Sequence, residues 1–160
     1  MGDLEHIQAL MKELVTFPEF VGVRQHDVES WSVFLAAEQE VFVDYLHDNE
    51  QIVIVGQLPL VELPQPSDLF RSMLNFNQVQ KSEHSSHVTL SADGKLLSVI
   101  MTLACQELCL QDFKVALLHF QQQFQGWQQV VRDPTCVYSL TSESKPVSAT
   151  RAAKSTLALR

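Results

Sequence analysis

The sequence predicts an α+β domain with a twisted, mostly antiparallel five-stranded sheet, in the order α-β-β-β-α-β-β-α. Three observations lead to this prediction. Three runs rich in Val, Ile and aromatic residues follow one another without a helix between them, and two more flank an Asp93-Gly94 pair, which is a strong hairpin signal. A stretch over residues 110–131 instead repeats bulky apolar residues at helical spacing. Because strands and helices are grouped rather than alternating, an antiparallel sheet is favoured.

The first expected element is a helix over residues 3–15. Asp3 is placed to cap it, apolar residues recur every three or four positions up to Leu14, and Pro18 ends it. A meander of three strands is expected to follow, because the next runs carry strand-forming residues and a turn-like "HDNEQ" separates the last two. These strands are predicted at residues 31–36, 40–47 and 51–58.

The stretch "LPLVELPQPS" carries three prolines and is expected to interrupt the sheet. Ser67 is placed to cap a short second helix over residues 68–77. The two strands around the Asp-Gly turn are then predicted at residues 87–92 and 95–103.

The third helix is predicted to begin near residues 108–110 and to be long enough, at about 1.5 Å per residue, to span about 30 Å of the sheet. We expect it to cover one face of the sheet, with the first helix beside it on that face. Its apolar stripe is interpreted as core rather than as a coiled-coil seam, because three heptads without a charge pattern specify no partner helix. The glutamines between the stripe positions are expected to face solvent. The stripe is Leu110, Phe113, Leu117, Phe120, Phe124, Trp127 and Val131.

Composition divides the chain into a domain over residues 1–132 and a tail over residues 133–160 that is expected to be flexible. The first part holds 7 Lys/Arg and 17 Asp/Glu, a net charge of −10, and the second has a net charge of +2. An acidic body lacks the clustered cations that nucleic acid or an anionic membrane would require. No apolar run approaches the roughly 20 residues of a membrane span, so membrane insertion is not expected.

The side chains that could carry chemistry form no recognisable site. Cys105, Cys109 and Cys136 are too few for a disulfide framework, and free thiols fit a reducing cytoplasm. Cys105 and Cys109 with His119 fall short of the four ligands that zinc prefers. No glycine-rich phosphate loop and no nucleophile motif occurs in the sequence. We therefore expect neither an enzyme nor a cofactor or metal.

The short second helix is apolar on nearly all sides, and such a helix must be buried on more than one side. This pattern predicts a dimer interface at the second helix, with strand 95–103 alongside. The expected interface residues are Leu69, Phe70, Met73, Leu74, Phe76, Val99 and Met101.

Three stretches together resemble the class I type III secretion chaperones, the Tir-chaperone-like proteins that escort effectors. "DLFRSMLNFNQ" resembles the short interface helix of that family, and "HVTLSADGKLLSVIMTL" resembles its Asp-Gly hairpin. "LCLQDFKVALLHFQQQFQGWQQVV" resembles its last helix, with Trp127 near the end. The resemblance covers residues 3–132. It departs from the family at "LACQEL", where a Leu-Pro is common, and in the longer tail.

The resemblance implies a cytoplasmic bacterial homodimer that binds the extended N-terminal segment of one or more secreted effectors and keeps them soluble and competent for secretion. It also implies the secretion-system ATPase as a further partner. Surplus apolar residues on the strands and the first helix are expected to line the effector groove, with ordinary core packing as the alternative for each. A small-molecule-binding or regulatory module, with a pocket between the third helix and the sheet, is the competing interpretation. The expected effector-binding residues are Leu10, Leu14, Trp31, Phe34, Phe42, Leu46, Ile52 and Ile54.

Overall fold

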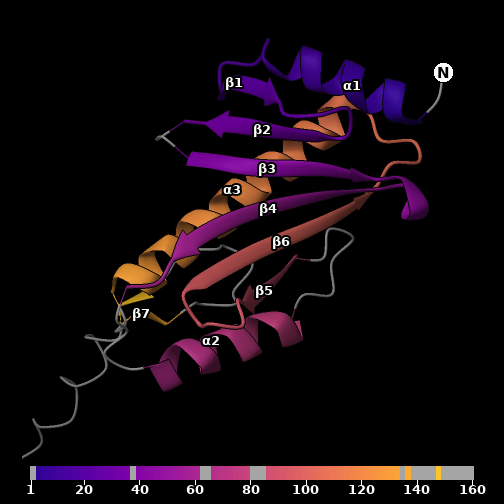
Figure 1. Ribbon diagram of the computed structural model, residues 1–160. Helices are drawn as coiled ribbons and strands as arrows, with labels where there is room; N and C mark the ends of the chain where they lie inside the picture. The colour runs from indigo at the N-terminus through magenta and orange to yellow at the C-terminus, as the bar shows by residue number, and fades with distance from the viewer. Residues whose placement is uncertain are drawn as a thin grey trace, which may run out of the picture.

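A six-stranded antiparallel sheet forms the centre of the molecule, with α1 and α3 on one face and α2 beside one edge (Figure 1). The computed structural model describes residues 3–36, 39–61, 66–79, 86–133, 136–137 and 147–148. The helices are α1 (Asp3–Leu14), α2 (Pro66–Val79) and α3 (Leu110–Arg132), with a 3-10 turn at His47–Asn49. The strands of the sheet are β1 (Phe20–Gln25), β2 (Ser30–Leu35), β3 (Gln39–Leu46), β4 (Gln51–Pro59), β5 (Ser86–Leu90) and β6 (Leu96–Ala104).

The strand order is β1-β2-β3-β4-β6-β5, and every neighbouring pair is antiparallel. The predicted α+β class and helix placement are confirmed, but the sheet has six strands rather than five. The additional strand, β1, is a weak sequence signal because it contains Gly22, its register with β2 shifts between Phe20 and Gly22, and only Phe20 is fully buried. Such an irregular edge strand lacks the apolar alternation that identifies a half-buried strand.

Alternation along β3 and β4 decides which side chains face the helices. In β3 every second residue from Gln39 to Tyr45 is buried, whereas Phe42 and Leu46 are exposed. In β4, Ile52 and Ile54 are fully buried. This two-residue period gives the sheet an inner face under α1 and α3 and an outer face that no described helix covers.

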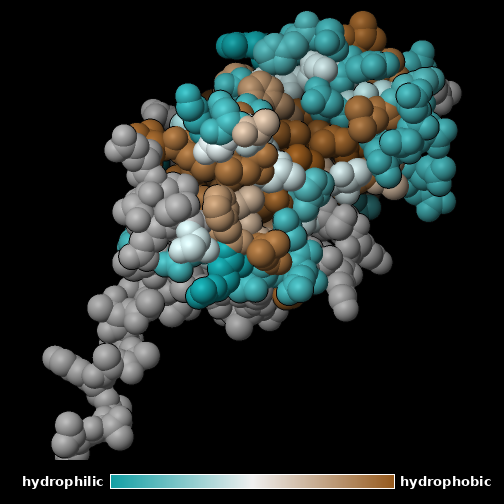
Figure 2. Space-filling model, turned by 60° about the horizontal axis from the view of Figure 1, so that its bottom comes forward, coloured by the Kyte–Doolittle hydropathy of each residue, from teal (hydrophilic) through white to brown (hydrophobic). Residues whose placement is uncertain are grey.

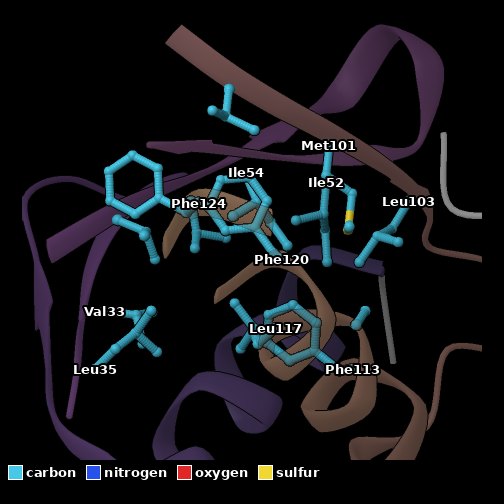
Figure 3. Packing of buried hydrophobic residues seen from close by; sticks show 14 of the residues in the cluster. Val33, Leu35, Ile52, Ile54, Met101, Leu103, Phe113, Leu117, Phe120 and Phe124 are labelled. Atoms are coloured by element: carbon cyan, nitrogen blue, oxygen red, sulfur yellow. The ribbon is translucent and has the colours of Figure 1, made fainter. Parts of the chain in front are cut away.

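The apolar stripe of α3 packs on the inner face, as predicted. Figure 3 shows the side chains of Phe113, Leu117, Phe120 and Phe124 gathered in one cluster with those of β4 and β6. The rings of Phe120 and Phe124 stack with centroids 6.0 Å apart. α1 contributes its own buried residues to the same core, which are Ile7, Leu10, Met11 and Leu14. No described helix is long and apolar enough to cross a membrane.

The expectation that the glutamines of α3 face solvent is wrong for one side of the helix. Gln39, at the start of β3, is only 5% exposed and lies against α3. Its side-chain amide donates to the Gln128 oxygen at 2.7 Å, and its oxygen accepts from Gln121 at 3.5 Å and Gln125 at 3.4 Å. A buried polar group is stable when it is hydrogen-bonded in this way. These amides therefore join the sheet to the helix, which a pattern of polar residues along one helix does not reveal.

The second helix is anchored to its own chain on one side. The ring of Phe76 meets that of Trp127 edge to face, with centroids 5.4 Å apart, and Leu69 is also buried. The side-chain amide of Asn77 bonds to the backbone of Val88 in β5: its nitrogen donates to the Val88 carbonyl at 3.0 Å and its oxygen accepts from the Val88 N–H at 2.8 Å. α2 thus lies along the β5 edge of the sheet (Figure 1).

Part of the predicted tail is described. Cys136–Val137 (β7) and Val147–Ser148 (β8) pair as a short antiparallel ladder. The rest of the tail after residue 133, and with it the expected flexibility, lies outside the described residues.

Candidate functional site

The outer face of the sheet carries a continuous row of side chains running across the strands. The pairing register places Phe42 opposite Val55, Val55 opposite Ile100 and Ile100 opposite His87. Phe42 is 36% exposed, and Leu46, four residues further along β3 on the same face, is 41% exposed, with Asp44 between them. Figure 2, which brings the lower side of the molecule forward, shows hydrophobic residues gathered in a band bordered by hydrophilic ones. Contiguous exposed apolar surface of this kind marks an interaction site more often than an ordinary surface does.

Three of the predicted effector-binding residues, Phe34, Phe42 and Leu46, lie on this outer face. The others are buried in the core between the sheet and the helices, each at most 4% exposed, so they offer little surface to a partner. Strand alternation separates the two faces of a sheet but does not tell which face the helices cover. The five buried residues are Leu10, Leu14, Trp31, Ile52 and Ile54.

A pocket of about 330 Å³ opens between α1 and the β1–β2 edge of the inner face. Its apolar lining comes from both elements, and Trp31, although buried, forms part of it. The pocket exists because α1 covers the end of the sheet incompletely, and no linear motif marks it. The lining residues are Gln8, Met11, Lys12, Val15, Val23, Gln25 and Trp31.

The two edges of the sheet differ. β1 has β2 as its one described strand partner, and Val21 within it is 75% exposed. At the opposite edge, the Asn77 amide occupies the backbone N–H and C=O of Val88 in the middle of β5. Unpaired backbone groups on an edge strand are a template for another chain. Among the described strands of the sheet, β1 is therefore the edge that is better able to accept one.

The side of α2 that faces away from its own chain forms a second apolar surface. Phe70 is 47% exposed, Leu74, about one turn further on, is 68% exposed, and Met73 is half-buried. Of the predicted dimer-interface residues, Phe70, Met73 and Leu74 have surface to offer. The other four are buried within one chain: Leu69, Phe76, Val99 and Met101.

The described thiols have separate structural environments. Burial, followed by the nearby carboxylates of Asp3 and Glu50, raises the pKa of Cys105 to about 11, so this thiol is protonated at neutral pH. Cys109 caps the N-terminus of α3, where its sulfur accepts from the Asp112 N–H at 3.4 Å. Within the described ranges, no group of three or more His, Cys, Asp or Glu side chains is arranged to hold a metal ion.

The fold exposes two apolar surfaces, and contiguous apolar surface of this kind commonly marks a site for protein partners. The model of the Tir chaperone protein (CesT) family matches residues 23–128, more than half of the chain. The chain therefore belongs to the Tir chaperone protein (CesT) family, and the resemblance drawn from the sequence is confirmed.

Two solved structures share the fold at low sequence identity. The chain is similar to a protein in the HopA1–SchA chaperone–effector complex, with a TM-score of 0.60 and 13% identity over 79% of this chain and 95% of that one. It is also similar to a protein in the ExsC–ExsE complex, with a TM-score of 0.64 and 15% identity over 82% of this chain and 97% of that one. A search of curated proteins gives no match.

Proposed function

We propose that this chain is a type III secretion chaperone that binds the extended N-terminal segment of one or more secreted effectors. It would keep that segment soluble and competent for secretion in the bacterial cytoplasm, and it would act as a homodimer. The observation that carries the proposal is the uncovered apolar outer face of the sheet, together with the open β1 edge, in a chain of the Tir chaperone family. The solved relatives with this fold come from complexes, one of them described as a chaperone–effector complex.

The outer face suits a partner without a fold of its own. A non-globular segment wraps a large surface and presents side chains to separate grooves, which a folded partner cannot do. Phe34, Phe42 and Leu46 supply apolar contacts on this face, and β1 offers main-chain hydrogen bonds at its free edge. The pocket beside α1 adds a position for an apolar anchor.

The homodimer is proposed from the exposed side of α2. Burying a Phe or Leu side chain completely contributes roughly 1.5–3 kcal/mol, and about half of that remains available for a half-exposed one. Association itself costs about 4–15 kcal/mol, so Phe70 and Leu74 of the two copies must be joined by further contacts. A two-fold axis beside α2 would bring the same residues together from both copies. The secretion-system ATPase is a further proposed partner, suggested by family membership alone.

The competing interpretation, a small-molecule module with a pocket between α3 and the sheet, is less well supported. That interface is filled by Phe113, Leu117, Phe120 and Phe124, each at most 3% exposed (Figure 3). A ligand would have to displace this packing.

Co-expression with an effector N-terminal fragment tests the proposal. We expect the tagged chain to co-purify with the fragment, and the Phe42→Asp/Leu46→Asp double variant to lose at least tenfold in affinity, because two charges would enter the apolar face. Val115→Asp, on the exposed side of α3, is the matched control and should bind normally. Circular dichroism confirms that each variant is folded. The proposal fails if the unchanged chain retains no effector fragment, or if the double variant binds as tightly as the control.

A further inference from the structure

Two cations flank the open β1 edge. Arg24 is the one charged residue of β1, and Lys12 is the one charged residue lining the pocket beside it. Both are exposed. Among the described residues, the one ion pair joins Lys114 to Glu19 at 2.9 Å. Neither Lys12 nor Arg24 therefore forms a salt bridge with a described carboxylate. Around this edge, among the described residues, positive charge lacks a carboxylate partner on a molecule whose net charge is −8.

The two cations lie on opposite faces of the sheet. The register pairs Val23 with Val33 on the inner face, toward α1 and the pocket, and pairs Arg24 with Ser32 on the outer face. The Arg24 guanidinium carbon is 5.2 Å from the centroid of the Phe34 ring, which holds its charge above the outer face. Lys12 projects from α1 at the pocket, on the inner side.

A strand that pairs with β1 must alternate its side chains between these two faces. Side chains on the inner side meet a pocket whose apolar lining includes Met11, Val15, Val23 and Trp31, with Lys12 beside it. Side chains on the outer side come within reach of Arg24. The edge thus presents one cation on each face and an apolar pocket on one of them.

We infer that the client segment bound at β1 directs apolar side chains into the pocket at alternate positions, with one carboxylate on that same side to pair with Lys12 and another at an intervening position to pair with Arg24. The inference rests on the proposed chaperone function and specifies the chemistry of its client. The acidic body as a whole would favour a basic partner, but the Debye length is about 8 Å at physiological ionic strength, so distant charges are largely screened. The two cations at the edge act at contact distance.

The turn after β1 limits where those carboxylates lie. Asp27 accepts from the backbone N–H of Glu29 at 2.8 Å, so the two acidic residues of this turn follow the strand rather than belonging to it. Carboxylates of the client are therefore disfavoured beside the turn and favoured beside Arg24.

Two synthetic peptides test the inference. Each has twelve residues with leucine at every second position except one near the end. In one peptide that position and its neighbours are Glu, in the other they are Lys, and the remaining positions are Ser in both. Fluorescence anisotropy should show the Glu peptide binding about tenfold more tightly, since each exposed pair gives a severalfold gain at most. The Lys12→Glu/Arg24→Glu double variant should reverse the preference. Lys95→Glu, in the β5–β6 turn at the opposite edge, is the matched control and should keep it.

Equal affinity for the two peptides, or tighter binding of the Lys peptide by the unchanged chain, overturns the inference. If neither peptide binds, the co-expressed effector fragment becomes the readout, and the double variant must weaken its binding while Lys95→Glu does not. An effector fragment that binds regardless of both substitutions removes the charge selection but leaves the chaperone function standing. If the chain binds neither peptide and no effector fragment, both the charge selection and the proposed chaperone function are wrong.

Discussion

The ring of Phe124 lies directly over Gly56, so closely that a β-carbon at position 56 would be 2.6 Å from two atoms of the ring. Gly56 is buried in the middle of β4, and Phe124 belongs to the apolar stripe of α3. A glycine inside a strand commonly marks a place where another part of the chain approaches closely. The missing side chain at position 56 allows the long helix to lie against the sheet.

Gly56→Ala should therefore destabilise the protein. The added methyl group collides with the ring unless Phe124 leaves its position, and overpacking of this kind costs about 1–3 kcal/mol. Urea denaturation measures the loss in the free energy of unfolding. Gly22→Ala is the control, because a β-carbon there meets no atom within 4 Å and should leave stability unchanged or slightly raised. Equal stabilities of the two variants would contradict the close packing of α3.

Gln39→Ala should loosen the attachment of α3 to β3. The substitution removes the shared partner of Gln121, Gln125 and Gln128, and a buried hydrogen-bonding group left unsatisfied costs about 1–3 kcal/mol. Thermal denaturation followed by circular dichroism gives the change. Gln122→Ala, at an exposed position of the same helix, should be close to neutral. A Gln39→Ala variant as stable as Gln122→Ala would show that the amide cluster adds nothing to stability.

Leu74→Asp, alone and with Phe70→Asp, should convert the proposed dimer into a monomer. Both side chains are already partly exposed in one chain, so the substitutions leave the core in place while adding charge to the proposed interface. Light scattering coupled to gel filtration gives the mass, and Val115→Asp should remain dimeric. A dimer mass for the double variant would remove α2 from the interface, and a monomer mass for the unchanged chain would remove the homodimer.

The Lys114–Glu19 pair should give a pH-dependent part of stability. The hydrogen bond from Lys114, more than any other factor, lowers the pKa of Glu19 below its ordinary value of 4.5. A lowered folded-state pKa stabilises the protein above pH 4.5, and this stabilisation is lost as the pH falls through the folded-state pKa. The difference in unfolding free energy between the unchanged chain and Lys114→Met should thus be largest near neutral pH and shrink below pH 4.5.

Some difference should persist in acid, because the Lys114 ammonium also lies 4.1 Å from the centroid of the Phe17 ring. That contact does not depend on the protonation of Glu19. Denaturant titrations between pH 3 and pH 7 measure both contributions. A constant difference across this range would mean that the ion pair contributes nothing.

Much of the fold follows from local patterns in the sequence. Helical spacing places α1 and α3, and the Asp93-Gly94 turn places the β5–β6 hairpin. The sequence does not predict β1, because an irregular edge strand that pairs with one neighbour needs little apolar alternation. Its presence depends on pairing with β2, which is a tertiary contact and not a local one.

The surfaces are harder to predict than the elements. Periodicity assigns Ile54 and Phe42 to strands that alternate, but the position of α3 decides that Ile54 is core and Phe42 is surface. The pocket beside α1 brings Lys12 and Trp31 together from different elements. Only the arrangement of α1 against the sheet creates such a neighbourhood.

The hydrogen bonds between the Asn77 amide and the Val88 backbone make the two edges of the sheet unequal as sites for an added strand. On the β5 flank the molecule itself occupies the backbone of Val88, so among the described strands the β1 flank is the more favourable place for an added strand. Unlimited edge-to-edge association of identical chains would need two open edges on each copy, and the β5 edge is partly occupied by Asn77. Covering one edge in this way disfavours edge-to-edge aggregation of the folded chain.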